Sequence, residues 1–238
     1  MHGSPAGRIF FGHQSVGENI LGGVRAVCSD FPIFSLSDQS LSRAPWGLYH
    51  KSLGVNREPA SKLEAFRQIV ERTGEYFDVA MMKLCYIDVD RDTDPQSLFS
   101  RYCLMVNEVE NAYPHICLIH ITVPIRTLRL GLRSNIRLLA GRRIGACEAA
   151  LRRDEYNDLL RGEFASSGKL FDLARIESTR RDGKVNEVRY PGGRVSSLLP
   201  ELTTDGGHLN ETGASLVATH LIELLNRHMP SNPRGSSN

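Results

Sequence analysis

Five short apolar runs alternate with longer amphipathic stretches, and this alternation limits the possible folds more than any other feature. The runs cover residues 8–12, 31–36, 77–84, 115–123 and 169–174. Helix-like stretches lie near residues 16–28, 60–73, 96–112, 146–165 and 210–228. This order predicts an α/β fold with a mostly parallel five-stranded sheet and helices on both of its faces. Because ligands bind at the carboxyl ends of such strands, functional residues are expected directly after the runs.

The length and composition fit one domain. With 238 residues, 41% of them hydrophobic, the chain can bury one large core more readily than two small ones. We expect this domain to cover residues 1–230 and the polar residues 231–238 to form a disordered tail. The segments 37–58 and 175–204 are expected to be long irregular connections, the second with a turn in its stretch RYPGGRV.

The charge and the cysteines exclude some classes of partner and site. The formal net charge is +2, from 29 basic and 27 acidic residues, which does not indicate nucleic acid or an anionic membrane as the main partner. The five cysteines include no CxxC pair, so free thiols in a reducing compartment are expected. No stretch approaches the length of a membrane span, and the N-terminus lacks the apolar segment of an export signal. A cytoplasmic location is therefore expected, unless an export signal has been removed.

A serine between two glycines follows the first apolar run, where the expected strand gives way to a helix. The stretch reads GHQSVG, with Ser15 between Gly12 and Gly17. At such a turn backbone N–H groups can stabilise an oxyanion, and glycines let a substrate approach closely. Ser15 is therefore a candidate nucleophile. Two plainer alternatives stay open: Ser15 caps the helix, and the glycines serve only the tight turn.

An aspartate and a histidine three residues apart precede the last expected helix. In the stretch DGGHLN, the Asp205 carboxylate can hold one ring nitrogen of His208 while the other nitrogen faces outward, as a general base requires. The alternative is that Asp205 forms only an Asx-turn beside an incidental histidine. Together with Ser15, however, the pair indicates nucleophilic catalysis. Asn210 is expected to cap the helix that follows.

The other histidines and cysteines give no sign of metal ligation. They form no cluster with the spacing of a metal site, so neither a metal ion nor another cofactor is expected. His115 and His120, at the ends of one apolar run, are expected to have structural roles.

These motifs, taken in order, resemble those of the SGNH hydrolases, the GDSL-like esterases and acetylhydrolases. The resemblance covers nearly the whole chain and rests on FGHQSVG, SLGVN, MMKLCYID, VPI and DGGHLN. It implies a three-layer α/β/α sandwich with a flavodoxin-like sheet. It also implies that Ser15 is the nucleophile, that His208 is the base and that Asp205 orients this base. The oxyanion hole of the family combines the N–H groups of the serine and of a glycine, here Gly54, with an asparagine side chain.

Two blocks depart from the family pattern. The first reads Gly-His-Gln-Ser, so His13 and Gln14 flank the nucleophile and are candidate pocket residues. In the third block Cys85 stands where the family has the asparagine of the oxyanion hole. Because a thiol is a weak donor, we favour Asn56, two residues after Gly54, as the source of the missing amide.

Other residues of the third block offer alternatives to this assignment. Lys83, Cys85 and Tyr86 are also candidate pocket residues. Lys83 or Tyr86 could donate from the strand end, or the hole could rest on backbone N–H groups alone. In the plainer interpretation, Cys85 serves core packing and Lys83 forms an ion pair with a nearby aspartate such as Asp88 or Asp90.

Arginines recur every three or four residues after the fourth run. Arg126, Arg129, Arg133 and Arg137 would lie on one face of a helix, at the edge where the site is expected. A solvated helix face is one interpretation. The other is an insert over the pocket that attracts an anionic substrate, since arginine binds anions with bidentate geometry.

The motifs together predict a metal-free serine esterase that cleaves a carboxylic ester through an acyl-serine intermediate. The expected partner is a small-molecule or carbohydrate ester, and acetyl is a family-level expectation for the acyl group. An acyltransferase with the same three residues, or a non-catalytic binding domain on a decayed hydrolase fold, remains an alternative. A nucleotide binder is disfavoured, because GHQSVG matches neither of the glycine-rich phosphate motifs.

Overall fold

A six-stranded parallel sheet forms the centre of the structure. The computed structural model describes residues 7–36, 45–129, 131, 144–190 and 193–229. The strand order is β2-β3-β1-β4-β5-β6, and every adjacent pair is parallel. The strands are β1 (Arg8–His13), β2 (Ile33–Ser35), β3 (Gly47–Ser52), β4 (Val79–Met82), β5 (Cys117–Ile121) and β6 (Leu170–Phe171).

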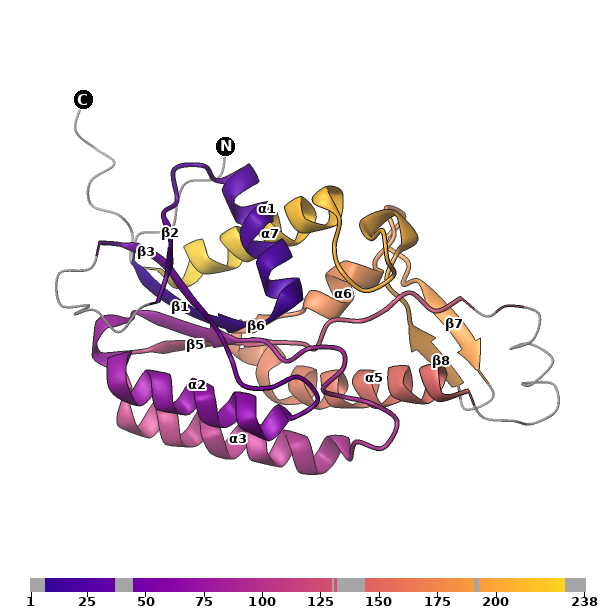
Figure 1. Cartoon of the computed structure of the whole chain (residues 1–238), viewed down its shortest axis with the longest axis horizontal. Coiled ribbons are helices and arrows are strands. Elements are labelled where there is room, and N and C mark those ends of the chain that lie inside the picture. The colour runs from indigo at the N-terminus through magenta and orange to yellow at the C-terminus, as the bar shows by residue number, and fades with distance from the viewer. Residues whose placement is uncertain (1–6, 37–44, 130, 132–143, 191–192, 230–238) are drawn as a thin grey trace.

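Helices cover both faces of this sheet (Figure 1). One face carries α1 (Ser15–Val27), α6 (Leu173–Ser178) and α7 (Glu211–His228). The other carries α2 (Pro59–Thr73), α3 (Pro95–Ala112) and α5 (Gly145–Phe164). Short 3-10 helices cover Gly74–Tyr76, Ala165–Ser167 and Pro200–Leu202. The predicted three-layer α/β/α fold class is confirmed, and the five predicted helices lie within one residue of their expected bounds.

The position of β1 in the sheet explains why its residues 9–11 are all apolar and do not alternate between apolar and polar residues. Successive residues of a strand point to opposite faces. β1 therefore places Ile9 and Phe11 in the core under α1 and α7, and Phe10 in the core under α2 and α3. All three side chains are fully buried, as expected for a strand covered on both faces.

The predicted number of strands was wrong. The sixth strand, β3, lies in segment 37–58, which was expected to be an irregular connection. Only its first three residues are buried, and its second half is polar and partly exposed, so the segment has no continuous apolar run. The last predicted run, 169–174, is also corrected, since its strand ends at Phe171 and α6 begins at Leu173.

The second predicted connection, 175–204, holds an antiparallel hairpin of β7 (Glu187–Tyr190) and β8 (Gly193–Ser196). Tyr190 pairs with Gly193, which agrees with the turn expected in RYPGGRV, although residues 191–192 lie outside the described residues. The expected tail, 231–238, also lies outside them.

The cysteines and the helices of the described ranges bear on disulfide formation and on membrane spans. All five cysteines lie in the described ranges, and none of them forms a disulfide. No helix within these ranges combines the length and apolar composition needed to cross a bilayer.

Helices α1 and α7 lie side by side on the same face of the sheet (Figure 1). Their contact is close at Gly23, where a Cβ atom would collide with the Ala214 carbonyl. The predicted cap of α7 is confirmed, because Asn210 Oδ1 accepts a hydrogen bond from Gly213 N at 2.9 Å. This packing fixes the start of α7 against α1.

The two histidines of the fourth predicted run are hydrogen-bonded, as expected for structural residues. His115 Nε2 lies 3.3 Å from the Gly74 carbonyl oxygen. His120 is buried, with its Nδ1 2.9 Å from the Tyr102 hydroxyl and its ring stacked on Phe164. Burial lowers the pKa of His120 to about 3, so the folded protein keeps this ring neutral at pH values where an unfolded histidine is charged.

This shift predicts an acid-sensitive contribution of His120 to stability. Below about pH 6.5 the unfolded chain binds a proton that folded His120 excludes, so stability falls as the pH falls. Between pH 7 and pH 5, wild type is expected to lose about 2 kcal/mol more unfolding free energy than His120→Gln. Urea denaturation at both pH values measures the difference. Equal losses would contradict it. The difference between wild type and His120→Gln is needed because burial raises the pKa of Glu177 to about 8. The proton that folded Glu177 binds makes stability rise as the pH falls, and this effect is the same in both proteins.

Candidate active site

Ser15 is the first residue of α1 and follows β1 by one residue, at the carboxyl edge of the sheet. Its side chain is exposed. The residue at the cap position is Gln14, and no side chain caps this helix end, so the alternative of a capping serine is not supported. Within the described residues, no hydrogen bond engages the Ser15 hydroxyl. The serine is therefore open to a ligand at the positive end of a helix.

Asp205 and His208 form the pair predicted from their spacing. Asp205 Oδ2 lies 2.6 Å from His208 Nδ1, and Asp205 Oδ1 accepts backbone N–H bonds from Gly207 and His208 at 2.8 Å each. The bond from the His208 ring, followed by those from the two N–H groups, holds the pKa of the Asp205 carboxyl well below its usual range. The carboxylate thus makes an Asx-type turn and also binds the ring, which leaves His208 Nε2 free to act as a base.

A hydrogen bond between α1 and the loop of His208 brings the two motifs together. Asn19 Oδ1 accepts from Leu209 N at 3.2 Å, and Asn19 lies one helical turn after Ser15, on the same side of α1. On its other side, the His208 ring meets the edge of the Tyr86 ring, with centroids 6.1 Å apart. Among the described residues no hydrogen bond joins Ser15 to the His208 ring, so the third contact of a triad stays a prediction.

The loop after β3 lies beside the Ser15 turn. Gln14 Nε2 donates to the carbonyl oxygens of Leu53 and Gly54, at 2.6 and 3.1 Å. Gly54 has a φ of +46°, a conformation that favours glycine, and no acceptor within the described residues binds its N–H. Gln14 thus holds the loop of Gly54, the second predicted oxyanion donor, beside the turn of Ser15.

A buried ion pair orients Asn56 in the same loop. Lys62 Nζ donates to Asn56 Oδ1 at 2.9 Å and to Asp88 Oδ2 at 2.6 Å, and the Lys62 and Asp88 side chains are fully buried. Because the lysine binds the amide oxygen, the Asn56 amide nitrogen is left for another partner. Asp88 also accepts the N–H groups of Cys85 and Arg57, at 2.6 and 2.9 Å. The two loops at this edge of the sheet therefore share one carboxylate.

These contacts correct one sequence-based interpretation. Asp88 pairs with Lys62 and not with Lys83, whose Nζ lies 3.4 Å from the Leu84 carbonyl oxygen and 3.9 Å from Cys85 Sγ. Lys83 is fully buried, and burial lowers its pKa. The role of Lys62 was not predicted from the sequence. Its only signal is a lysine on the otherwise apolar buried face of α2.

Solved structures of other proteins match this architecture over nearly the whole chain, whereas no protein-family model and no curated protein matches the sequence. One match is described as a lipolytic protein of the G-D-S-L family from Desulfitobacterium hafniense. The TM-score is 0.54 at 10% identity, over 91% of this chain and 98% of the other. The chain has the fold of the SGNH hydrolases.

Two further neighbours share this SGNH fold. An acetyl-xylooligosaccharide esterase from Geobacillus has a TM-score of 0.50 at 12% identity, over 94% of this chain and 96% of its own. The periplasmic domain of a Salmonella lipopolysaccharide acetyltransferase has a TM-score of 0.52 at 12% identity, over 92% and 84%. At these identities the likeness concerns the fold.

Within the SGNH fold, the predicted pocket residue His13 lies beneath the Ser15 turn. His13 is fully buried, with Nδ1 3.1 Å from the Gln14 carbonyl oxygen and Nε2 3.0 Å from His50 Nδ1. Glu18 Oε1 lies 3.7 Å from His13 Nε2 and 3.9 Å from His50 Nδ1. Among the described residues, these three side chains form the group that could hold a metal ion. They come from β1, β3 and α1, so no local spacing reveals them.

Cys85 and Tyr86, the other predicted pocket residues, differ in exposure. Cys85 is 3% exposed, which agrees with the packing alternative. Tyr86 is partly exposed, and the Arg126 guanidinium lies over its ring, 5.1 Å from the centroid. Residues 126–129 are not helical, so the predicted arginine-bearing helix is wrong there. Arg133 and Arg137 lie outside the described residues.

Proposed function

We propose that this chain is a serine hydrolase of carboxylic esters, with Ser15 as nucleophile, His208 as general base and Asp205 as its orienting group. The observation that carries the proposal is the Asp205–His208 hydrogen bond of 2.6 Å, in a loop that is bonded to α1 one turn after the exposed Ser15. This arrangement supports the proposal, because acyl transfer through a serine requires a serine near a histidine that a carboxylate holds.

The reaction would proceed in two steps. His208 Nε2 takes the Ser15 proton as Oγ attacks the ester carbonyl, and it returns this proton to the departing alcohol. Water, deprotonated by the same nitrogen, then attacks the acyl-serine. The bond to Ser15 Oγ breaks, His208 returns the proton to this oxygen, and the acid is released. Asp205 stays ionised throughout and stabilises the imidazolium. The N–H groups of Ser15 and Gly54 and the Asn56 amide would bind the oxyanion of both tetrahedral intermediates.

The acyl group is proposed to be small, such as acetyl, and the alcohol to be a carbohydrate. The SGNH-fold neighbour described as an acetyl-xylooligosaccharide esterase supports this choice. The acetyltransferase neighbour supports the second candidate, transfer of the acyl group to another alcohol. Assaying free acid and transferred ester, with and without an alcohol acceptor, distinguishes the two.

A fluorophosphonate probe tests the proposed nucleophile without knowledge of the substrate. Wild type is expected to be labelled on Ser15, since only an activated serine reacts readily. Ser15→Ala should abolish the labelling. Ser100→Ala is the matched control, because Ser100 is an exposed helical serine of α3 whose hydroxyl donates to the Gln96 carbonyl oxygen. An unlabelled wild type would favour a non-catalytic binding domain.

A further inference from the structure

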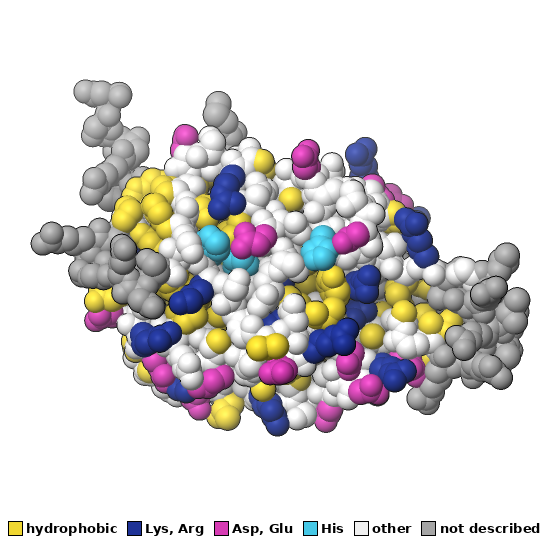
Figure 2. All heavy atoms as spheres, in the orientation of Figure 1, with side chains coloured by type: hydrophobic (Ala, Val, Ile, Leu, Met, Phe, Trp, Pro, Cys, Tyr) yellow, Lys and Arg dark blue, Asp and Glu magenta, His cyan; other side chains and the backbone are white. Residues whose placement is uncertain are grey.

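A cavity of about 660 Å³ opens beside the loop of His208. Asp205 and Gly206 form part of its wall, and Tyr86 forms another part. Four arginines line it, whereas the acidic residues are Asp90 and Asp205. Asp205 already binds His208, so positive charge dominates the cavity. Figure 2 shows basic side chains gathered near a histidine and an acidic side chain on this face of the molecule.

Arg153 is the buried member of the four. It comes from α5 and is 4% exposed. Its Nη1 donates to the carbonyl oxygens of Tyr86 and Val89, at 3.0 and 3.2 Å, which are neutral acceptors. Within the described part of the chain, no carboxylate forms an ion pair with it, and its buried Nε has no hydrogen-bond partner. Burial lowers the pKa of Arg153 to about 10, so it stays charged at neutral pH. The nearby carboxylates of Asp154 and Asp90 favour its charge through space, but neither forms an ion pair with it. A buried cation without a contacting carboxylate is costly, and an anion beside it would offset that cost.

Arg126 and Arg129 form the exposed side of the same wall. The Arg126 guanidinium carbon lies over the Tyr86 ring, a cation–π contact that occupies none of the guanidinium N–H groups with a hydrogen-bond acceptor. In the described residues, neither arginine forms an ion pair with a carboxylate. Both are therefore available to bind an anion.

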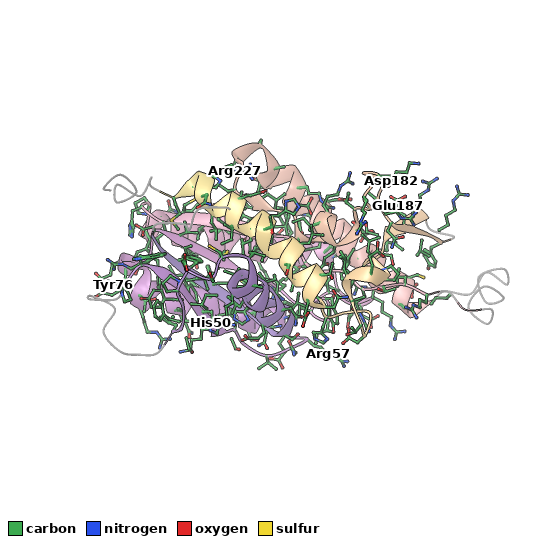
Figure 3. All side chains as sticks on the ribbon, turned by 90° about the horizontal axis from the view of Figure 1, so that it is seen from above. His50, Arg57, Tyr76, Asp182, Glu187 and Arg227 are labelled. Carbon is green, nitrogen blue, oxygen red and sulfur yellow. The ribbon has the colours of Figure 1, made fainter. Side chains whose placement is uncertain are left out.

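Arg57, the fourth arginine that lines the cavity, belongs to the loop of Gly54 and Asn56. Its φ of +68° is the single positive value of a non-glycine residue in the described ranges. Asp88 Oδ1 holds this backbone by accepting its N–H. Figure 3 shows Arg57 along the same side of the molecule as His50. Such strained residues cluster at functional sites, and here the strained residue lines the cavity.

We propose that this cavity binds an acidic group of the substrate, a carboxylate or a phosphate, so that the ester cleaved is an anion. The statement about the substrate rests on the proposed function, because it takes the Asp205–His208 pair as part of the catalytic site. The anion site itself rests on the four arginines.

Binding to the Ser15→Ala variant tests the site without catalysis. Isothermal titration with glucuronate and with inorganic phosphate is expected to show binding that weakens as salt is added, whereas glucose, the neutral counterpart of glucuronate, should not bind. Tighter binding of glucuronate indicates a carboxylate, and tighter binding of phosphate indicates a phosphate. Either result supports the site, and binding of neither anion at millimolar concentrations overturns it.

Arginine variants locate the binding. Arg126→Gln and Arg129→Gln, each made in the Ser15→Ala background, should weaken anion binding by about 10-fold or more. These side chains are exposed, so both variants are expected to fold even if Arg153→Gln does not. Arg175→Gln, an exposed arginine of α6 outside the cavity, is the matched control and should bind as before. Equal affinities in all variants would overturn the proposal.

Kinetics then connect the site to the substrate. The active enzyme should have a higher kcat/KM for acetylated glucuronate than for acetylated glucose, and Arg126→Gln should remove this preference. Arginine-dependent anion binding in a protein whose Ser15 does not react with the fluorophosphonate supports the anion site while the proposed function fails. Labelled Ser15 without arginine-dependent binding overturns the anion site alone.

Discussion

Turnover of an activated ester by His208→Ala is expected to fall by about 10⁴-fold or more, because no other group would take the Ser15 proton in the transition state. The neighbouring contacts should survive the change. Leu209 N would still bind Asn19, and Asn210 would still cap α7. The loss should therefore appear in kcat while the thermal unfolding temperature changes little.

His220→Ala is the matched control for this variant. His220 is also an exposed histidine with an acid three residues away, since its Nδ1 lies 3.6 Å from Glu223 Oε2, but it lies within α7. Its loss should leave turnover near the wild-type value. Retained turnover in His208→Ala would show that the Asp205–His208 pair is structural.

The second large effect is expected at Asn56. Asn56→Ala should reduce kcat by about 100-fold with a smaller change in KM, because an oxyanion donor binds most strongly when negative charge develops. The geometry supports this role, since Lys62 binds the Asn56 oxygen and leaves its N–H₂ group available. One activated ester, assayed at saturating and at low concentrations, separates the two kinetic constants.

Cys85→Ala provides the comparison, because the resemblance to the SGNH hydrolases aligns Cys85 with the asparagine of their oxyanion hole. Its side chain is buried and its N–H donates to Asp88, so the substitution should mainly lower stability. If Cys85→Ala loses turnover while Asn56→Ala keeps it, the strand-end block supplies the oxyanion donor and the assignment to Asn56 is wrong.

The parts of the fold that the sequence predicted are those with a local pattern. The five long helices carry apolar residues at helical spacing, and β1 is apolar on both faces because both are covered. The Asp205–His208 bond was predictable for the same reason, since its two residues lie three positions apart in one loop.

The missed parts depend on residues that are distant in sequence. Strand β3 is polar in its second half and is fixed by pairing with β1 and β2. The Lys62–Asp88 ion pair joins α2 to the loop after β4, and neither residue shows in its own segment that it has a partner. The same holds for His13, His50 and Glu18, whose convergence depends on the strand order.

The close contact of α1 with α7 limits which amino-acid substitutions this protein can accept. Ser15 begins α1, and the loop of His208 ends at the start of α7, so the position of one helix on the other sets the distance between the proposed nucleophile and the proposed base. Gly23 and Ala214 determine that position where the backbones meet. A bulkier residue at Gly23 would push the two helices apart and misalign the reacting atoms, although it lies two helical turns from Ser15. If Ser15 and His208 act as proposed, a substitution at this helix interface would lower turnover without touching either residue.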